Sequence, residues 1–159
     1  MADEVRITNA DLIVDEGEKV QYIVIKLGNE QYGIDIKYID NIVRMQSITR
    51  VPKVQEYFKG VINLRGEVVP VMSLRIKMNL SDDEITNKSR IIILKLESNA
   101  NIGILVDEVK KVVTISDGDI ERTSHDRKSG MQTFISGVGK VEGGLISLLD
   151  LSMIIDDEE

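Results

Sequence analysis

The chain lacks cysteine and tryptophan, and its 159 residues include one histidine and two prolines. Without cysteine it can form neither a disulfide framework nor a thiolate metal site. Aromatic residues make up only 4% of the chain, so a packed core has to be aliphatic. Valine and isoleucine dominate the periodic segments, and both favour strands. We therefore expect an all-β fold.

Long apolar runs and an excess of positive charge are also missing. No apolar run approaches the roughly 20 residues that are needed to cross a bilayer. The acidic start, residues 1–19, lacks the basic segment of a secretory signal. The net charge of −7 disfavours nucleic-acid binding, because phosphates would repel the chain. We expect a cytoplasmic protein with no direct membrane insertion and no nucleic-acid partner.

Groups that could support catalysis are few. His125 lies in a polar segment, and no nucleophile motif accompanies it. The segment 117–119 (Asp-Gly-Asp) begins like a calcium loop but lacks the acidic residue that would complete one. The glycines at 137 and 139 precede a strand and not a helix, so they do not form a phosphate-binding loop. We expect no enzyme activity, no catalytic residues, no metal site and no cofactor, which leaves recognition of other proteins.

The stretch 58–74 gives the clearest structural signal. Two runs of β-forming residues flank the turn residues 63–66, which predicts a hairpin. Pro70 has no N–H to donate, so we expect the second run to be an edge strand or to begin a bend. Arg65 lies near the predicted tip, where its guanidinium could form a bidentate pair with a carboxylate of a partner. The alternative is an intramolecular salt bridge to Asp35, Asp40 or Glu67.

The chain also contains one β-unit twice. The run at 22–27 returns at 91–96, and the hairpin at 58–74 returns at 135–151. Each unit holds about five short strands, which suits a small closed barrel, and the polar segment 77–89 separates the units. We therefore expect two small barrels packed on each other with a groove between them.

This division predicts the domain boundaries. Residues 1–17 are expected to be a flexible segment, 18–155 the folded domain and 156–159 an acidic tail. The folded part divides into subdomains at roughly 18–83 and 84–155, and strands could be exchanged between them. We also expect short helical turns and a short C-terminal helix.

Apolar residues occupy equivalent places after the second strand of each unit. They are Ile39 and Ile42 in the first unit and Val109 and Val112 in the second. These side chains could line both sides of the groove and hold an amphipathic helix. The alternative is that they belong to the ordinary core.

The two predicted hairpins differ at their tips. Asn63 and Arg65 of the first correspond to Lys140 and Glu142 of the second. A position that is alike in both units serves the architecture, whereas a position that differs is free for function. Arg65 therefore belongs to a task of the first hairpin alone.

Four motifs cover the chain from about residue 20 to residue 155: YGIDIKYIDNIV, FKGVINLRGEVVPVMSLR, IGILVDEVKKVV and ISGVGKVEGGLISLLDL. With these motifs, in this order, the chain resembles the CheW family, the coupling proteins of bacterial chemotaxis. The resemblance implies two SH3-like five-stranded β-barrels. It also implies a non-enzymatic adaptor that bridges the cytoplasmic tip of methyl-accepting chemoreceptors to the regulatory domain of the histidine kinase CheA, which pairs with the adaptor barrel to barrel.

The resemblance carries over to single residues. Arg65 matches the hairpin arginine of the family, which is implicated in receptor-linked signalling. The apolar residues of the predicted groove match positions that face the receptor helices. The predicted receptor-binding set is Ile39, Ile42, Asn63, Arg65, Val109 and Val112. We expect a cytoplasmic protein recruited to membrane-associated receptor arrays, and the alternative function is a self-associating barrel module that builds homotypic assemblies.

Overall fold

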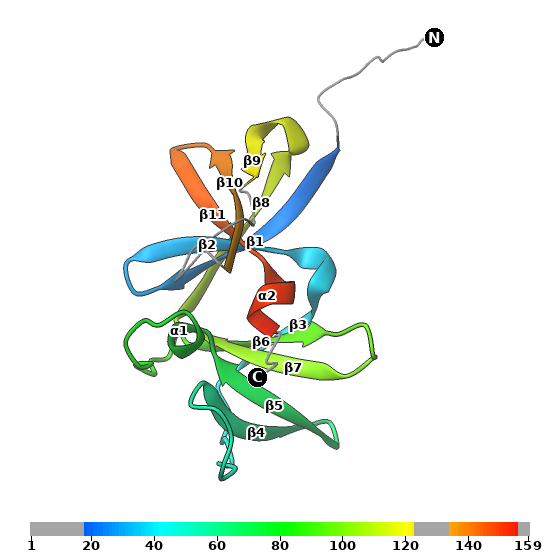
Figure 1. The fold of residues 1–159 in the computed structure, drawn as a ribbon, viewed down its shortest axis with the longest axis vertical. Coiled ribbons are helices and arrows are strands. Elements are labelled where there is room, and N and C mark those ends of the chain that lie inside the picture. Colours follow the sequence, from blue (N-terminus) through cyan, green and yellow to red (C-terminus); the bar gives the residue numbers. More distant parts are fainter. Residues whose placement is uncertain (1–17, 123–133, 156–159) are drawn as a thin grey trace.

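The computed structural model describes residues 18–122 and 134–155, which form two β-sheets stacked along the long axis of the molecule (Figure 1). The five-stranded sheet, called barrel 1, contains β3 (Ile39–Arg44), β4 (Phe58–Leu64), β5 (Glu67–Ser73), β6 (Arg90–Lys95) and β7 (Asn101–Val106). The six-stranded sheet, called barrel 2, contains β1 (Lys19–Leu27), β2 (Glu30–Asp35), β8 (Glu108–Ser116), β9 (Ile120–Arg122), β10 (Ile135–Val141) and β11 (Gly144–Leu149). The helices are short: η1 (Ile36–Tyr38), α1 (Leu74–Lys77), η2 (Asp117–Asp119) and α2 (Leu151–Ile155).

Each sheet curls so that its two end strands approach each other. The strand order is β3-β6-β7-β5-β4 in barrel 1 and β8-β1-β2-β11-β10-β9 in barrel 2. In barrel 1 the segment after β3 reaches β4 through a bridge between Thr49 and Val61. In barrel 2 the helix η2 joins β8 and β9, which lie at opposite ends of the strand order. The predicted pair of small β-barrels and the short C-terminal helix are confirmed.

The strands of the two sequence units are exchanged between the barrels. Strands β1 and β2 come from the first unit and lie in barrel 2, whereas β6 and β7 come from the second unit and lie in barrel 1. Position by position, β8-β1-β2-β11-β10 corresponds to β3-β6-β7-β5-β4. The chain therefore crosses between the barrels after β2 and again after β7.

Apolar side chains fill three layers, one inside each barrel and one between the barrels. The interior of barrel 1 is built around Ile91 and Ile93, and that of barrel 2 around Tyr22 and Val24. The layer between the barrels, called the seam, contains buried side chains from both, including Ile23, Ile25, Leu27, Met72, Leu74, Ile92, Leu94 and Ile104. Strands β1 and β6 are apolar on both faces because one face lines a barrel and the other lines the seam.

Of the two alternatives predicted for the strand that holds Pro70, the edge strand is wrong. The edge strand is β4, and β5 lies between β4 and β7. The pairing of β5 with β7 covers only residues 71–73, so Pro70 lies just outside this ladder and opposite Val61 of β4. Its missing N–H therefore costs no hydrogen bond to β7, and an internal strand can hold this proline.

Candidate functional site

The turn of the β4–β5 hairpin has an unusual backbone. Leu64 pairs with Glu67, so Arg65 and Gly66 form a two-residue loop, with φ values of 54° and 85°. Positive φ at both positions is the mark of a type I′ turn, which strongly prefers asparagine followed by glycine. The side-chain oxygen of Asn63 accepts a hydrogen bond from the N–H of Gly66 at 3.2 Å. Asn63 thus supports the turn, and Arg65 occupies a conformation that does not suit an arginine.

The guanidinium of Arg65 points to solvent. Arg65 is exposed, and no hydrogen bond or ion pair of its side chain occurs within residues 18–122 and 134–155. Of the acids proposed as intramolecular partners, Asp35 lies 3.9 Å from the ammonium of Lys37 and Asp40 lies 3.8 Å from that of Lys95, and Glu67, which flanks the turn, forms no ion pair with Arg65 in the described parts of the chain. This geometry favours the reading in which Arg65 serves a contact outside its own chain.

The β10–β11 hairpin, at the equivalent place in barrel 2, turns differently. Val141 pairs with Gly144, and of the loop residues Glu142 and Gly143 only the glycine has a positive φ, 95°. Glu142 therefore carries no backbone strain, although it corresponds to Arg65. The two hairpins differ in the sign of the exposed charge and in the turn that carries it.

Both hairpins expose a large apolar side chain that is not in the predicted set of site residues. Val68 of β5 is 67% exposed and Leu145 of β11 is 69% exposed, more than the other large apolar residues in the described parts of the chain. The two positions are equivalent in the repeat. Their exposure could have been predicted from the alternation of side chains along a strand. Each residue precedes a buried one, Val69 or Ile146, and therefore faces outward.

The remaining predicted residues lie on two strands that border the seam. Ile39 and Ile42 of β3 and Val109 of β8 are partly buried and pack against the seam. Val112 of β8 is 54% exposed. Strand β3 belongs to barrel 1 and β8 to barrel 2. Three of the four residues thus border one apolar layer from both barrels, and Val112 is exposed on the same strand as Val109. Asn63 and Arg65 lie apart from them on the β4–β5 hairpin.

Asn41 lies between these apolar residues but serves the opposite face of β3. It pairs with Ile93, and with Val43 it follows the alternation that faces the interior of barrel 1. Its side-chain oxygen is buried and has no hydrogen-bond partner in the described parts of the chain. Asn41 is therefore not part of the surface that Ile39 and Ile42 border.

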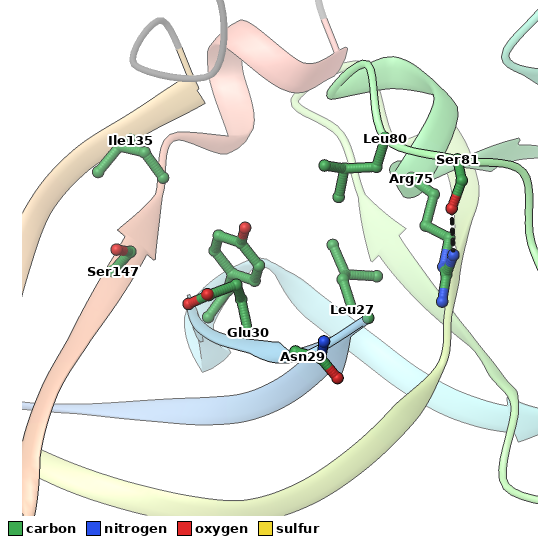
Figure 2. A pocket seen from close by; sticks show the side chains of 10 residues that line it. Leu27, Asn29, Glu30, Arg75, Leu80, Ser81, Ile135 and Ser147 are labelled. Atoms are coloured by element: carbon green, nitrogen blue, oxygen red, sulfur yellow. Dashed lines mark hydrogen bonds between the residues drawn. The ribbon is translucent and has the colours of Figure 1, made fainter.

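A cavity of about 530 Å³ lies at one end of the seam (Figure 2). Leu27 and Leu80 form its apolar floor, and Glu30, Arg75 and Ser81 are among its polar lining. None of the predicted site residues lines it. In the same parts of the chain, no three His, Cys, Asp or Glu side chains gather closely enough to bind a metal ion. Nor does any helix there have the length and apolar character to cross a membrane.

Comparison with known proteins decides the family. The family model described as "CheW-like domain" matches residues 21–159. The chain belongs to the CheW-like domain family. The resemblance stated from the four sequence motifs is thereby confirmed.

Similar proteins cover nearly the whole chain. The chemotaxis protein CheW of Bacillus subtilis is 35% identical over 145 residues, 91% of each chain. That of Rhizobium meliloti is 30% identical over 152 residues, 96% of this chain and 97% of its own. Among solved structures, the scaffolding protein TtCheW of Thermoanaerobacter tengcongensis has a TM-score of 0.80 at 29% identity and covers 89% of this chain and 95% of its own. The CheW-like domain thus accounts for the two-barrel fold.

Proposed function

We propose that the protein is a chemotaxis scaffold that couples methyl-accepting chemoreceptors to the histidine kinase CheA and has no catalytic activity of its own. The observation that carries the proposal is its membership of the CheW-like family, whose similar members include a chemotaxis protein and a scaffolding protein of matching length. Such a protein works in the cytoplasm and is recruited to receptor arrays at the membrane. Its chemistry is binding, so exposed apolar and charged side chains are its working parts.

The helical tip of the receptor binds along β3 and β8. Ile39, Ile42 and Val109 offer partly buried apolar edges, and Val112 is open to solvent. A helix with apolar residues spaced by three and four can bury such edges while its polar face stays in water. Because the two strands belong to different barrels, one helix would contact both halves of the scaffold.

The kinase regulatory domain binds at the hairpin ends of the barrels. Val68 and Leu145 expose apolar surface to water, which is unfavourable unless a partner covers it. Each lies three residues after the charged residue of its hairpin tip. An apolar anchor beside a charge is the composition that favours a specific, desolvated contact. The resemblance places Arg65 in the receptor-binding set, but Arg65 lies apart from β3 and β8 on the β4–β5 hairpin. We therefore propose that it supplies a bidentate donor for a carboxylate of the kinase domain instead.

Replacing Val112 with aspartate tests the receptor site. We expect Val112→Asp to weaken binding of a receptor cytoplasmic fragment roughly tenfold, because the carboxylate would be desolvated against the apolar face of the helix. The control is Ile85→Asp on the segment 78–89, which connects α1 and β6 of barrel 1, since Ile85 is 55% exposed and Val112 is 54% exposed. Equal binding by both variants, measured by titration calorimetry, would remove β8 from the proposed site.

The strained turn gives a second prediction. Replacing Arg65 with asparagine should raise the free energy of unfolding by about 0.5–1 kcal/mol, because asparagine tolerates positive φ. The same variant should bind the kinase regulatory domain more weakly. Urea denaturation measures the first effect, and Glu142→Asn, at a position without positive φ, is the control that gains no stability. A loss of stability in Arg65→Asn would mean that the guanidinium serves the fold.

Homotypic assembly is the second candidate function, and the tips of the hairpins favour it. Arg65 and Glu142 occupy equivalent places on the two barrels and carry opposite charges, so barrel 1 of one copy complements barrel 2 of the next. Contacts of this head-to-tail kind build rings or filaments. Sedimentation over a wide range of protein concentration separates the candidates, because a protein that stays monomeric does not work mainly by self-assembly.

A further inference from the structure

One charged cluster joins the two barrels across the seam. Arg75 lies in α1 of barrel 1, Asp107 lies between β7 and β8 where the chain crosses to barrel 2, and Gly28 lies in the β1–β2 turn of barrel 2. Arg75 Nε donates to Asp107 Oδ1 at 2.8 Å and Nη2 donates to Oδ2 at 2.5 Å. The Gly28 N–H also donates to Oδ2, at 2.8 Å. We call these three residues the clasp.

The clasp lies where the apolar packing of the seam is interrupted. Arg75 lines the cavity of about 530 Å³ that Figure 2 shows, and it also lines a second cavity of about 220 Å³. Its side chain is only 11% exposed and that of Asp107 only 17%. The bidentate geometry fixes the orientation of the pair, and losing one partner at so little exposure would leave a buried charge without its counter-charge, which costs more than losing a surface salt bridge. At this end of the seam, polar bonds therefore hold the barrels where side-chain packing does not.

The guanidinium is also fixed from its other side. Nη1 donates to Ser81 Oγ at 3.0 Å and to the carbonyl oxygen of Asp82 at 3.1 Å. The hydrogen bonds from Arg75 and Gly28 outweigh the effect of burial and lower the pKa of Asp107, so the carboxylate stays charged at neutral pH. The clasp is thus a preorganised unit rather than a chance surface pair.

The repeat does not reproduce the clasp at the other end of the seam. Ser152 of α2 takes the place of Arg75, and Glu97 takes the place of Gly28. The Ser152 hydroxyl donates to Asp150 of its own turn at 2.6 Å. Lys37 takes the place of Asp107, and within the parts of the chain that the structure describes no hydrogen bond joins it to Ser152 or Glu97. One end of the seam is clasped, and the equivalent end is not.

Asp107 also sets the start of β8. Its own N–H donates to the carbonyl oxygen of Lys26 at 3.2 Å, and Val109 follows two residues later. Strand β8 carries Val109 and Val112 in barrel 2, whereas Ile39 and Ile42 are in barrel 1. The spacing between these two apolar sets therefore depends on how the barrels are oriented, and the clasp fixes that orientation at one end.

We propose that Arg75 is a positioning residue that holds the angle between the barrels and thereby the spacing of the apolar residues of β3 from those of β8. The role of the clasp in holding this angle does not depend on the proposed function. Its consequence for receptor binding rests on the proposed function. Arg75 acts through Asp107 and contacts no partner itself.

Distances between labels on the two barrels test the angle directly. The chain contains no cysteine, so Glu67→Cys in barrel 1 and Lys140→Cys in barrel 2 would carry the only spin labels. Arg75→Lys keeps the charge but loses the fork of donors, and we expect it to broaden or shift the distance distribution. The matched control is Arg122→Lys, because Arg122 pairs with Asp117 at 2.6 Å inside barrel 2 and should leave the distribution unchanged. An unchanged distribution in Arg75→Lys would overturn the proposal.

Binding of the receptor cytoplasmic fragment tests the consequence. We expect Arg75→Lys to weaken binding roughly fivefold and Arg122→Lys to leave it unchanged. Weaker binding with an unchanged label distance would mean that Arg75 contacts the receptor, which also overturns its role as a positioning residue. If the unsubstituted protein does not bind the fragment, the proposed function fails, and the label distances still decide whether the clasp sets the angle.

Discussion

Replacing Gly60 with alanine is expected to lower the free energy of unfolding by roughly 3–4 kcal/mol, since strain and overlap act together. Gly60 has a φ of 140°, which an alanine rarely adopts. A Cβ at this position would overlap the carbonyl oxygen of Thr49. That carbonyl accepts the hydrogen bond from Val61 N–H at 2.8 Å that closes barrel 1. The methyl group therefore has to break the closure or bend the strand.

Gly66→Ala is the matched control for this prediction. Gly66 also has a positive φ, 85°, but no atom lies within 4 Å of the place its Cβ would take. It should cost only about 1 kcal/mol, from backbone strain alone. Urea denaturation of both variants measures the difference, and similar losses would show that the approach of Thr49 does not hold barrel 1 closed.

In the second repeat a glycine also lies where the barrel closes, and an added Cβ would overlap its neighbour less severely. Gly137 corresponds to Gly60, and a Cβ there would lie 2.8 Å from the carbonyl oxygen of Glu121. Each glycine follows an irregularity in the pairing of its hairpin, between residues 58 and 60 in β4 and between residues 135 and 137 in β10. A glycine is thus needed where a second segment crosses close to the bent strand.

Much of the fold follows from local pattern in the sequence. The apolar runs at 22–27 and 91–96, the turn at Arg65 and Gly66, and the repeat together predict the strands and the two barrels. Strand exchange could not be decided in this way, because a strand that is apolar on both faces fits either barrel equally well. The neighbours of β1 and β6 depend on where the chain crosses, and the residues after β2 and β7 carry no local signal for that.

The sequence predicts some residues of the candidate site and not others. Comparison of the two repeats singled out Arg65, because a difference between equivalent positions is visible in the sequence. The clasp was not visible, since Arg75 and Asp107 are 32 residues apart and each is an ordinary charged residue in its own segment. Only the folded chain shows that Asp107 meets Arg75 and the N–H of Gly28 in one place.

Stability below neutral pH should depend on two aspartates that act in opposite directions. Hydrogen bonds from Arg75 and Gly28 overcome burial and lower the pKa of Asp107 below 3.8. Its contribution is therefore fully present above the unfolded pKa and is lost as the pH falls through the folded value. Burial raises the pKa of Asp83 above 3.8, despite the hydroxyl of Ser73 and the ammonium of Lys59. This carboxylate costs stability as the pH rises through that range.

The asparagine variants should separate these two effects at pH 7. Asp107→Asn should cost about 2 kcal/mol, because Arg75 stays buried without its counter-charge. Asp83→Asn should cost nothing or raise stability slightly. Its side chain is 4% exposed, and one of its oxygens has no hydrogen-bond partner in the described part of the chain. The amide removes a buried charge and can still accept from Ser73, whose hydroxyl lies 2.5 Å from the carboxylate.

Denaturation midpoints between pH 3 and pH 7 measure both variants against the unsubstituted protein. The deficit of Asp107→Asn should shrink as the pH falls toward the lowered pKa, because the unsubstituted protein then loses the same charge. If the deficit stays constant with pH, Asp107 acts through packing and not through its charge. If Asp83→Asn is strongly destabilised at pH 7, the Lys59 pair at 3.7 Å outweighs the burial of the carboxylate, and that ion pair holds the segment 78–89 against β4 of barrel 1.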